Sequence, residues 1–375
     1  MKCKLEDICC FRKEKVEVEN LNTQNYISTE NMLSNKRGIT GASSLPTVLL
    51  TQKYKKDDVL VSNIRPYFKK IWQAKYDGGC SNDVLVFVPD SNIDKDFLYY
   101  VLADDDFFTY SMATSKGTKM PRGDKVSIMQ YEVPLFDLHT QKKIASILKS
   151  LDEKIELNNK INNNLLQQLH ILYSRLFCDS AMDTPLGEVV ATTSGGTPSR
   201  KHDEYYSDSS ICWVKSKELL GNYIHETEEH INDLAIKKSS AKLLPKHSVL
   251  IAMYGATVGA CGVISKPMTC NQAVCALLCN ENYPYTYLFQ IAYESQQKFI
   301  NLAVGSAQQN ISQVLIKQLN LHSDLNIIQK FHGLALPMHQ EIESLQAENM
   351  HLAALRDNLL PKLMSGELDV SNIDL

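Results

Sequence analysis

The sequence predicts an α/β (α+β) protein with two tandem β-rich domains, each followed by a long α-helix, the two helices pairing as an antiparallel coiled coil. Three observations support this fold class. Apolar residues follow a heptad pattern in the middle of the 375-residue chain, and a second heptad pattern runs near its C-terminal end. The segments that precede the two patterns resemble one another, which predicts a pseudo-twofold internal repeat.

The first long helix is predicted over residues 139–178, where apolar positions alternate four and three residues apart. This spacing is typical of a helix that packs along its length against another helix. At about 1.5 Å per residue the helix spans roughly 55 Å, so we expect a spacer, capped at its start by Thr140. The seam comprises Ile144, Leu148, Leu151, Ile155, Asn158, Asn162, Leu165, Leu169, Leu172 and Leu176.

The second long helix, within residues 326–375, repeats the rhythm at Met338, Ile342, Leu345, Asn349, Leu352, Arg356, Leu359 and Leu363. An antiparallel pair places Asn349 opposite Asn158 and Asn162. Buried polar seam residues weaken a coiled coil but fix its register, and we assign that role to these three residues. Pro337 and Pro361 predict a shorter or kinked second helix, and Gly366 follows its end. The alternative is two amphipathic helices that are buried separately.

The repeat is visible as a nearly constant offset between similar segments. Leu5–Ile8 resembles Leu186–Val189 at an offset of 181, and Cys80–Val84 resembles Cys270–Val274 at 190. Short β-branched or alternating segments bounded by Gly, Pro, Asn and Asp predict strands in both copies. We therefore divide the chain into a first β-rich domain (1–138), the first helix (139–178), a second β-rich domain (179–325), and the second helix with a C-terminal tail (326–375).

Composition predicts a cytoplasmic protein. No apolar run is long enough to span a membrane, and the charged start lacks a signal-peptide core. The ten cysteines show no CxxC pair or zinc-like spacing. Cys270, Cys275 and Cys279 lie in an apolar stretch that predicts one buried strand, so we expect reduced thiols and no metal site. The net charge of −4 is unusual for a nucleic-acid binder.

No catalytic motif is present. The sequence has no Walker A loop, no dinucleotide-binding turn, no nucleophile elbow, and no Asn/Asp-Pro-Pro-aromatic tetrapeptide of an amino-methyltransferase. We therefore expect no catalytic residue and no cofactor in this chain.

Four stretches are informative. The loop in 184–200 is small and polar and precedes Arg200 and Lys201, which suits phosphate contact; its alternative is a plain Gly-Pro turn. In 253–262, Gly255 and Gly259 allow a tight turn beside Tyr254, and the first copy carries Arg65 and Lys69 there. Segment 305–312 aligns with 117–124, and 359–368 closes the second helix. Gln308, Gln309 and Asn310 suit an adenine edge and Arg122 a guanine edge; the alternative is a glutamine-rich surface turn.

These motifs, LGE…GGTPS, YGATVG, GSAQQNIS and LLPKLMSGEL, resemble the specificity subunit (HsdS family) of type I restriction–modification enzymes over essentially the whole chain. The first half departs from the pattern, since ICCFRKEKVEV replaces the GGTPS loop and IRPYFKK replaces YGATVG. The resemblance implies that each recognition domain reads one half of a bipartite, asymmetric double-stranded DNA target. The helix pair would set the distance between the halves.

The resemblance also implies partners. Two methylation subunits would supply S-adenosylmethionine and methylate adenine N6, and restriction subunits would add ATP- and Mg²⁺-dependent translocation and cleavage. The expected DNA-binding residues are Arg65, Lys69, Lys116, Lys119 and Arg122 in the first unit, and Arg200, Lys201, Lys215, Tyr254, Gln308, Gln309 and Asn310 in the second. The alternatives are a non-catalytic two-lobed scaffold that binds no DNA and a self-sufficient methyltransferase.

Overall fold

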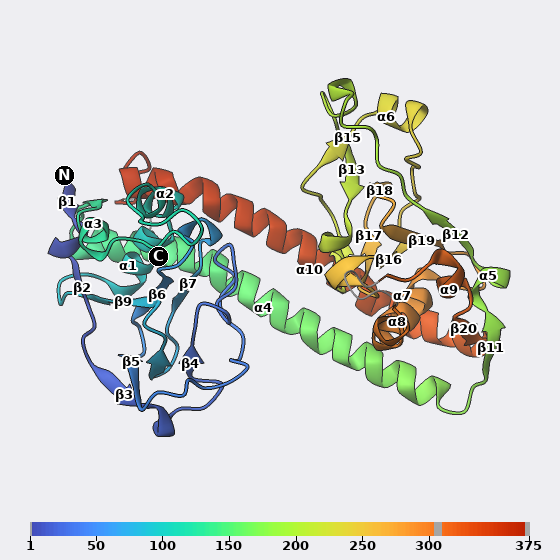
Figure 1. The fold of residues 1–375 in the computed structure, drawn as a ribbon, viewed down its shortest axis with the longest axis horizontal. Helices are drawn as coiled ribbons and strands as arrows, with labels where there is room; N and C mark the ends of the chain where they lie inside the picture. Colours follow the sequence, from blue (N-terminus) through green and yellow to red (C-terminus); the bar gives the residue numbers. More distant parts are fainter. Residues whose placement is uncertain (1, 304–309, 372–375) are drawn as a thin grey trace. The chain divides into compact units, whose positions relative to one another are not determined.

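The computed structural model describes residues 2–303 and 310–371. The chain forms two compact units (Figure 1). Unit 1 comprises residues 1–155 and 351–375, and unit 2 comprises residues 156–350. Both boundaries fall inside the long helices, so each unit contains a part of each helix. The domain boundaries given above, which treat the helices as separate segments, stay a prediction.

Unit 1 holds two four-stranded sheets and a two-stranded ribbon. The first sheet has the antiparallel order β2-β9-β6-β7, and the second has the order β3-β5-β8-β4, in which β4 and β8 are parallel. The strands are β1 (Lys2–Lys4), β2 (Cys9–Phe11), β3 (Lys15–Glu17), β4 (Tyr26–Ile27), β5 (Leu50–Tyr54), β6 (Val59–Ser62), β7 (Ile71–Gln73), β8 (Gly78–Cys80), β9 (Val84–Pro89) and β10 (Glu132–Pro134). The helices are α1 (Lys95–Ala103), α2 (Asp105–Ala113) and α3 (Lys125–Met129), with 3₁₀ turns η1 (Leu5–Asp7), η2 (Val18–Asn20) and η3 (Pro66–Phe68).

Unit 2 repeats this plan. A five-stranded sheet has the order β12-β19-β16-β17-β14, a three-stranded sheet the order β15-β13-β18, and β11 pairs with β20. The strands are β11 (Met182–Pro185), β12 (Ala191–Ser194), β13 (Ile211–Val214), β14 (Tyr223–Ile224), β15 (His230–Ile231), β16 (Val249–Ala252), β17 (Cys261–Ile264), β18 (Thr269–Cys270), β19 (Val274–Leu278) and β20 (Asn320–His322). The helices are α5 (Leu186–Val189), α6 (Asp233–Lys238), α7 (Tyr285–Glu294), α8 (Gln296–Leu302) and α9 (Gln313–Lys317), with 3₁₀ turns η4 (Asp203–Tyr205), η5 (Ser216–Glu218) and η6 (Gly255–Thr257).

The predicted long helices are α4 (Leu138–Phe177, 40 residues) and α10 (Leu325–Ser365, 41 residues). All the predicted seam positions are buried or half-buried. In unit 1, Leu148 of α4 and Leu363 of α10 belong to one apolar cluster with the sheet residue Val59 and with Phe97 of α1. In unit 2, Leu169 of α4 and Phe331 of α10 belong in the same way to the apolar core beside the five-stranded sheet. The helix ends are thus built into the cores of the two units.

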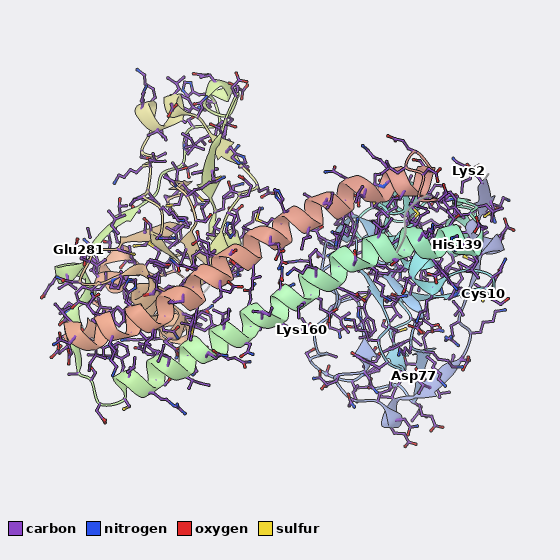
Figure 2. The ribbon with its side chains drawn as sticks, turned by 180° about the vertical axis from the view of Figure 1, so that it is seen from behind. Lys2, Cys10, Asp77, His139, Lys160 and Glu281 are labelled. Carbon is purple, nitrogen blue, oxygen red and sulfur yellow. The ribbon has the colours of Figure 1, made fainter. Side chains whose placement is uncertain are left out.

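Polar contacts between α4 and α10 confirm the antiparallel pairing (Figure 2, where His139 and Lys160 mark α4). In unit 2, Asn158 donates to Asn349 at 2.9 Å and to the Glu348 carboxylate at 2.7 Å, and Asn349 donates to Asn159 at 3.0 Å. In unit 1, Arg356 donates to Asp152 at 2.7 Å. The register role of Asn158, Asn162 and Asn349 itself stays a prediction.

Two predictions about the helix ends and lengths were wrong. Asp137, and not Thr140, caps α4, because its Oδ1 accepts the backbone N–H groups of His139 and Thr140 at 2.9 and 3.0 Å. The second helix is not the shorter one, since α10 has 41 residues and α4 has 40, with Pro337 and Pro361 both inside α10; the alternative of a kink stays a prediction. Each proline removes one backbone hydrogen bond, at a cost of about 3 kcal/mol, which the burial of seam side chains outweighs. Gly366 follows α10 with a positive φ of 76°, as predicted.

Candidate nucleic-acid interface

Two backbone donors of the loop after β12 are already used within unit 2. The N–H of Gly195 donates to the carbonyl of Val274, and that of Gly196 donates to the carbonyl of Cys270. A Cβ at Gly195 would lie 1.9 Å from the Cys270 carbonyl oxygen, and one at Gly196 would lie 2.4 Å from the backbone of Ser240. The two glycines are therefore explained by close backbone packing.

The residues after this loop do form a charged cluster. The Arg200 guanidinium lies 4.3 Å from the ring centre of Tyr206 and 5.5 Å from that of Trp213, and the Lys215 amine lies 5.6 Å from Trp213. Both cations pair with the carboxylate of Glu229. Hydrogen bonding to Lys215, together with that to Arg200, keeps the pKa of Glu229 below its ordinary value. The structure thus brings Arg200 and Lys215 together, with exposed Lys201 next in the chain.

Trp213 is the platform of this cluster. It is 3% exposed, and its indole N–H donates to the carbonyl of Gly196 at 3.0 Å. Tyr206 is likewise fixed, because its hydroxyl donates to the carbonyl of Pro198 at 2.7 Å. Stacking on two anchored rings restricts the rotamers of Arg200, which favours contact with a planar or anionic ligand.

Tyr254 and Asn310 meet at a second place in unit 2. They form an isolated β-bridge, and the N–H of Ile311 donates to the carbonyl of Met253. Tyr254 is 39% exposed, and the following turn has positive φ at Gly255 and Gly259, as the sequence predicted. Asn310 and Tyr254 thus lie side by side on the surface. Gln308 and Gln309 lie outside the described residues.

Unit 1 has the corresponding bridge between Ile64 and Arg122, and Arg122 also pairs with Lys116 along the backbone. Arg65 has a φ of 50°, its N–H donates to the carbonyl of Pro121, and its Nε is buried without a partner. The loops predicted to correspond in the two copies therefore do correspond in space. Lys119, which lies between Lys116 and Arg122 in the chain, is exposed.

Three of the cations predicted in unit 1 are paired with aspartates. Arg122 lies 2.8 Å from Asp83, and Lys116 lies 2.8 Å from Asp124. The hydrogen bond from Lys116, followed by those from Ser127, lowers the pKa of Asp124 to about 2. Lys69 lies 2.7 Å from Asp105. The sequence showed the cations but not the carboxylates that face them.

Two groups were missed from the sequence. The first is a polar pocket of about 480 Å³ in unit 1, lined by residues 26, 28–31 and 40–46 and by Ser81 and Asp83. Because Asp83 pairs with Arg122, this pocket adjoins the predicted guanine-reading side chain. No sequence motif marks it, since its walls come from three separate segments.

The second group is Cys212, Glu226 and His230, whose ligand atoms lie within 4.8 Å of one another. The Glu226 carboxylate accepts from the thiol at 2.9 Å, lies 2.5 Å from His230 Nε2, and forms an ion pair with Lys266 at 3.0 Å. The ion pair with Lys266 balances the charge of the Glu226 carboxylate. Together with the two hydrogen bonds, this ion pair explains the cluster without a metal ion. The only sequence signal was the four-residue spacing of Glu226 and His230.

The cysteine stretch forms two strands and not the one that we expected. Cys270 ends β18 and Cys275 lies in β19, with a turn between them, and Cys279 follows β19. Burial raises the pKa of each of these thiols to about 12. They are therefore protonated at neutral pH, which is unfavourable for metal binding.

Comparison with known proteins identifies the family to which this chain belongs. Residues 1–167 and 181–323 each match the family model described as type I restriction modification DNA specificity domain. The MjaIX specificity subunit of a type I restriction enzyme from Methanocaldococcus jannaschii is 24% identical over 76% of this chain and 72% of its own. The HindI specificity subunit from Haemophilus influenzae is 24% identical over 92% of this chain and 94% of its own.

A solved structure agrees in fold. The S subunit of a type I restriction-modification system from M. genitalium covers 99% of this chain and 96% of its own, with a TM-score of 0.59 and 16% identity. No helix in the described part of the chain is long and apolar enough to cross a membrane.

Proposed function

Because this chain belongs to the family of type I restriction modification DNA specificity domains, we propose that it is the DNA-recognition subunit of a type I restriction–modification complex. The observation that carries the proposal is that the specificity domain is matched twice, once in each copy of the repeat. Two non-identical readers suit a bipartite, asymmetric target in double-stranded DNA. The chain itself catalyses nothing, and it acts in the cytoplasm.

The DNA contacts come from the two bridged loops and the charged cluster. In unit 1 these are Arg65, Lys69, Lys116, Lys119 and Arg122, and in unit 2 they are Arg200, Lys201, Lys215, Tyr254, Gln308, Gln309 and Asn310. Lysines and Arg200 position the protein on phosphates, and Arg122 and the amide side chains read base edges in the major groove. The exposed positions of Lys119, Arg122 and Arg200 support this assignment.

Methylation subunits, two per chain, bind S-adenosylmethionine and methylate adenine at N6 after the base is turned out of the duplex. Restriction subunits add ATP- and Mg²⁺-dependent translocation and cleavage. The names of the relatives, which are specificity subunits of type I restriction enzymes, support this division of labour. The length of the helix pair sets the number of unspecified base pairs between the two half-sequences.

The proposal is tested by expressing this chain with the methylation subunit encoded beside it in cells that lack other adenine methylation, and mapping N6-methyladenine across the genome. We expect one bipartite motif to be modified. Methylation that depends on the partner but follows no bipartite motif would contradict the proposal, and so would no methylation by a complex shown to assemble. The latter result would favour a scaffold that does not bind DNA.

A further inference from the structure

In each unit one carboxylate lies between two cations that other contacts already hold close together. In unit 2 these are Glu229 with Arg200 and Lys215. In unit 1 they are Asp105 with Lys36 at 2.8 Å and Lys69 at 2.7 Å. Lys36 belongs to none of the sequence motifs. We call these two groups the triads.

Contacts other than these ion pairs also hold the two cationic residues of each triad close together. The N–H of Lys36 donates to the carbonyl of Lys69 at 2.9 Å, and both residues have positive φ, at 60° and 49°. In unit 2 both cations lie against the ring of Trp213, which is fixed by its own hydrogen bond. Like charges held together repel, so a fold that fixes two of them side by side has built a place for anions.

One carboxylate neutralises one of the two charges. Each triad therefore keeps a net charge of about +1, which matches one phosphate group. One member of each triad is well exposed, Asp105 at 58% and Arg200 at 56%, whereas Lys36 and Lys215 are 12% and 21% exposed. Both triads contain cations that the proposed function assigns to DNA.

We propose that each triad is a phosphate-binding site whose carboxylate competes with DNA, so that Glu229 and Asp105 lower the affinity for non-target DNA. This inference rests on the proposed function. A phosphate must displace the carboxylate from the cations before it binds at full strength. Target DNA makes additional base contacts that compensate for this displacement, whereas non-target DNA does not, and the carboxylates thereby increase discrimination. This arrangement also gives a reason for the acidic net charge of −4 in a DNA reader.

The test uses the full chain with its methylation subunit and two duplexes of equal length, one carrying the target found by methylation mapping and one with both half-sequences changed. The variants are E229Q and D105N. Each has a neighbour as a matched control: E228Q removes the same charge but releases Lys217, and D106N removes the same charge from an exposed residue that follows Asp105. Fluorescence anisotropy at several salt concentrations gives affinity and its salt dependence.

Relative to their controls, E229Q and D105N should bind the non-target duplex about 2- to 25-fold more tightly, since each variant breaks two ion pairs and each exposed ion pair is worth a factor of roughly 1.5 to 5. The slope of log affinity against log salt should steepen by about 0.9 for each new phosphate contact. The ratio of target to non-target affinity should fall. Adding K36Q to D105N should abolish the gain, because it returns the net charge of the triad from +2 to about +1.

If E229Q and D105N match their controls, or if they bind non-target DNA less tightly, the inference is wrong. A wild-type complex that does not prefer the target duplex contradicts the proposed function instead. The two failures are therefore distinguishable from one data set.

Discussion

The helix seam of unit 2 contains two buried asparagines with different surroundings, and replacing them separately should have opposite effects. Asn158 is 0% and Asn162 is 4% exposed, and the Oδ1 atom of each is buried without a partner. Asn158, however, donates two hydrogen bonds across the seam, to Asn349 and to the Glu348 carboxylate. From the sequence alone, changing Asn158, Asn162 and Asn349 to leucine is expected to raise thermal stability while loosening the register. The structure predicts that the positions differ.

For Asn162→Leu, removing an unsatisfied buried amide gains about 1–3 kcal/mol. Burying the leucine side chain gains about 1.5–3 kcal/mol, and its extra volume costs about 1–3 kcal/mol. The central values leave a stabilisation of about 2 kcal/mol, which corresponds to about 4–8 °C in Tm for a unit of this size.

Asn158→Leu makes the same gains but loses two hydrogen bonds, one of them to a charged acceptor. Those bonds contribute about 0.5–1.5 and 1.5–3 kcal/mol, so we expect this variant to be neutral or destabilised by about 1 kcal/mol. Urea denaturation and calorimetry of the full chain measure both changes. If Asn158→Leu stabilises as much as Asn162→Leu does, the Asn158–Asn349 contact contributes nothing and the reasoning is refuted.

Three further predictions concern backbone packing, pH and spacing. Gly195→Ala should destabilise unit 2 by more than about 3 kcal/mol, because the new Cβ collides with backbone atoms. Gly333→Ala lies on an open part of α10 and should stabilise the unit by about 0.5–1 kcal/mol. Equal effects of the two substitutions in denaturation would contradict the packing argument. Burial lowers the pKa of His339 to about 3, so on acidification this histidine is protonated in the unfolded chain before it is protonated in the folded one. The free energy of unfolding should therefore fall by about 1.4 kcal/mol per pH unit between about pH 6.5 and about pH 3. His339→Gln should flatten that dependence, and an unchanged pH profile would exclude His339 as its source. One added heptad in both α4 and α10 lengthens the pair by about 10 Å, and methylation mapping should then show a gap wider by roughly three base pairs; an unchanged gap would refute the spacing role.

The long helices could be predicted from the sequence because a heptad pattern is local. The pairing of Asn158 with Asn349 could also be predicted, because two seams that each carry a polar residue near the middle have few ways to align. The cap was missed because α4 begins at Leu138, several residues before Ile144, the first residue of the seam. Pro337 and Pro361 misled because a local helix breaker was weighed without the seam burial that outweighs it.

The site was only partly predictable. Lys69 was found in a loop that corresponds in the two copies, and Arg200 was found beside the GGTPS loop, which the first copy lacks. Their carboxylates lie far away in the chain: Lys69 and Asp105 are 36 residues apart, and Arg200 and Glu229 are 29 apart. Pairings of this kind follow from strand order, which the sequence does not state. The reason for a glycine at position 195 could not be predicted from the sequence either. A side chain there would collide with the backbone around Cys270, which is distant in the chain.

The most direct test of the central claim, that each recognition unit reads its own half of the target, is a methylation map of a chimaera. Residues 184–325 are replaced by the corresponding segment of another specificity subunit whose target is known, and the chimaera is expressed with the same methylation subunit. We predict a bipartite motif in which one half-sequence is replaced and the other half is unchanged. A motif in which both halves change, or neither does, would contradict the account.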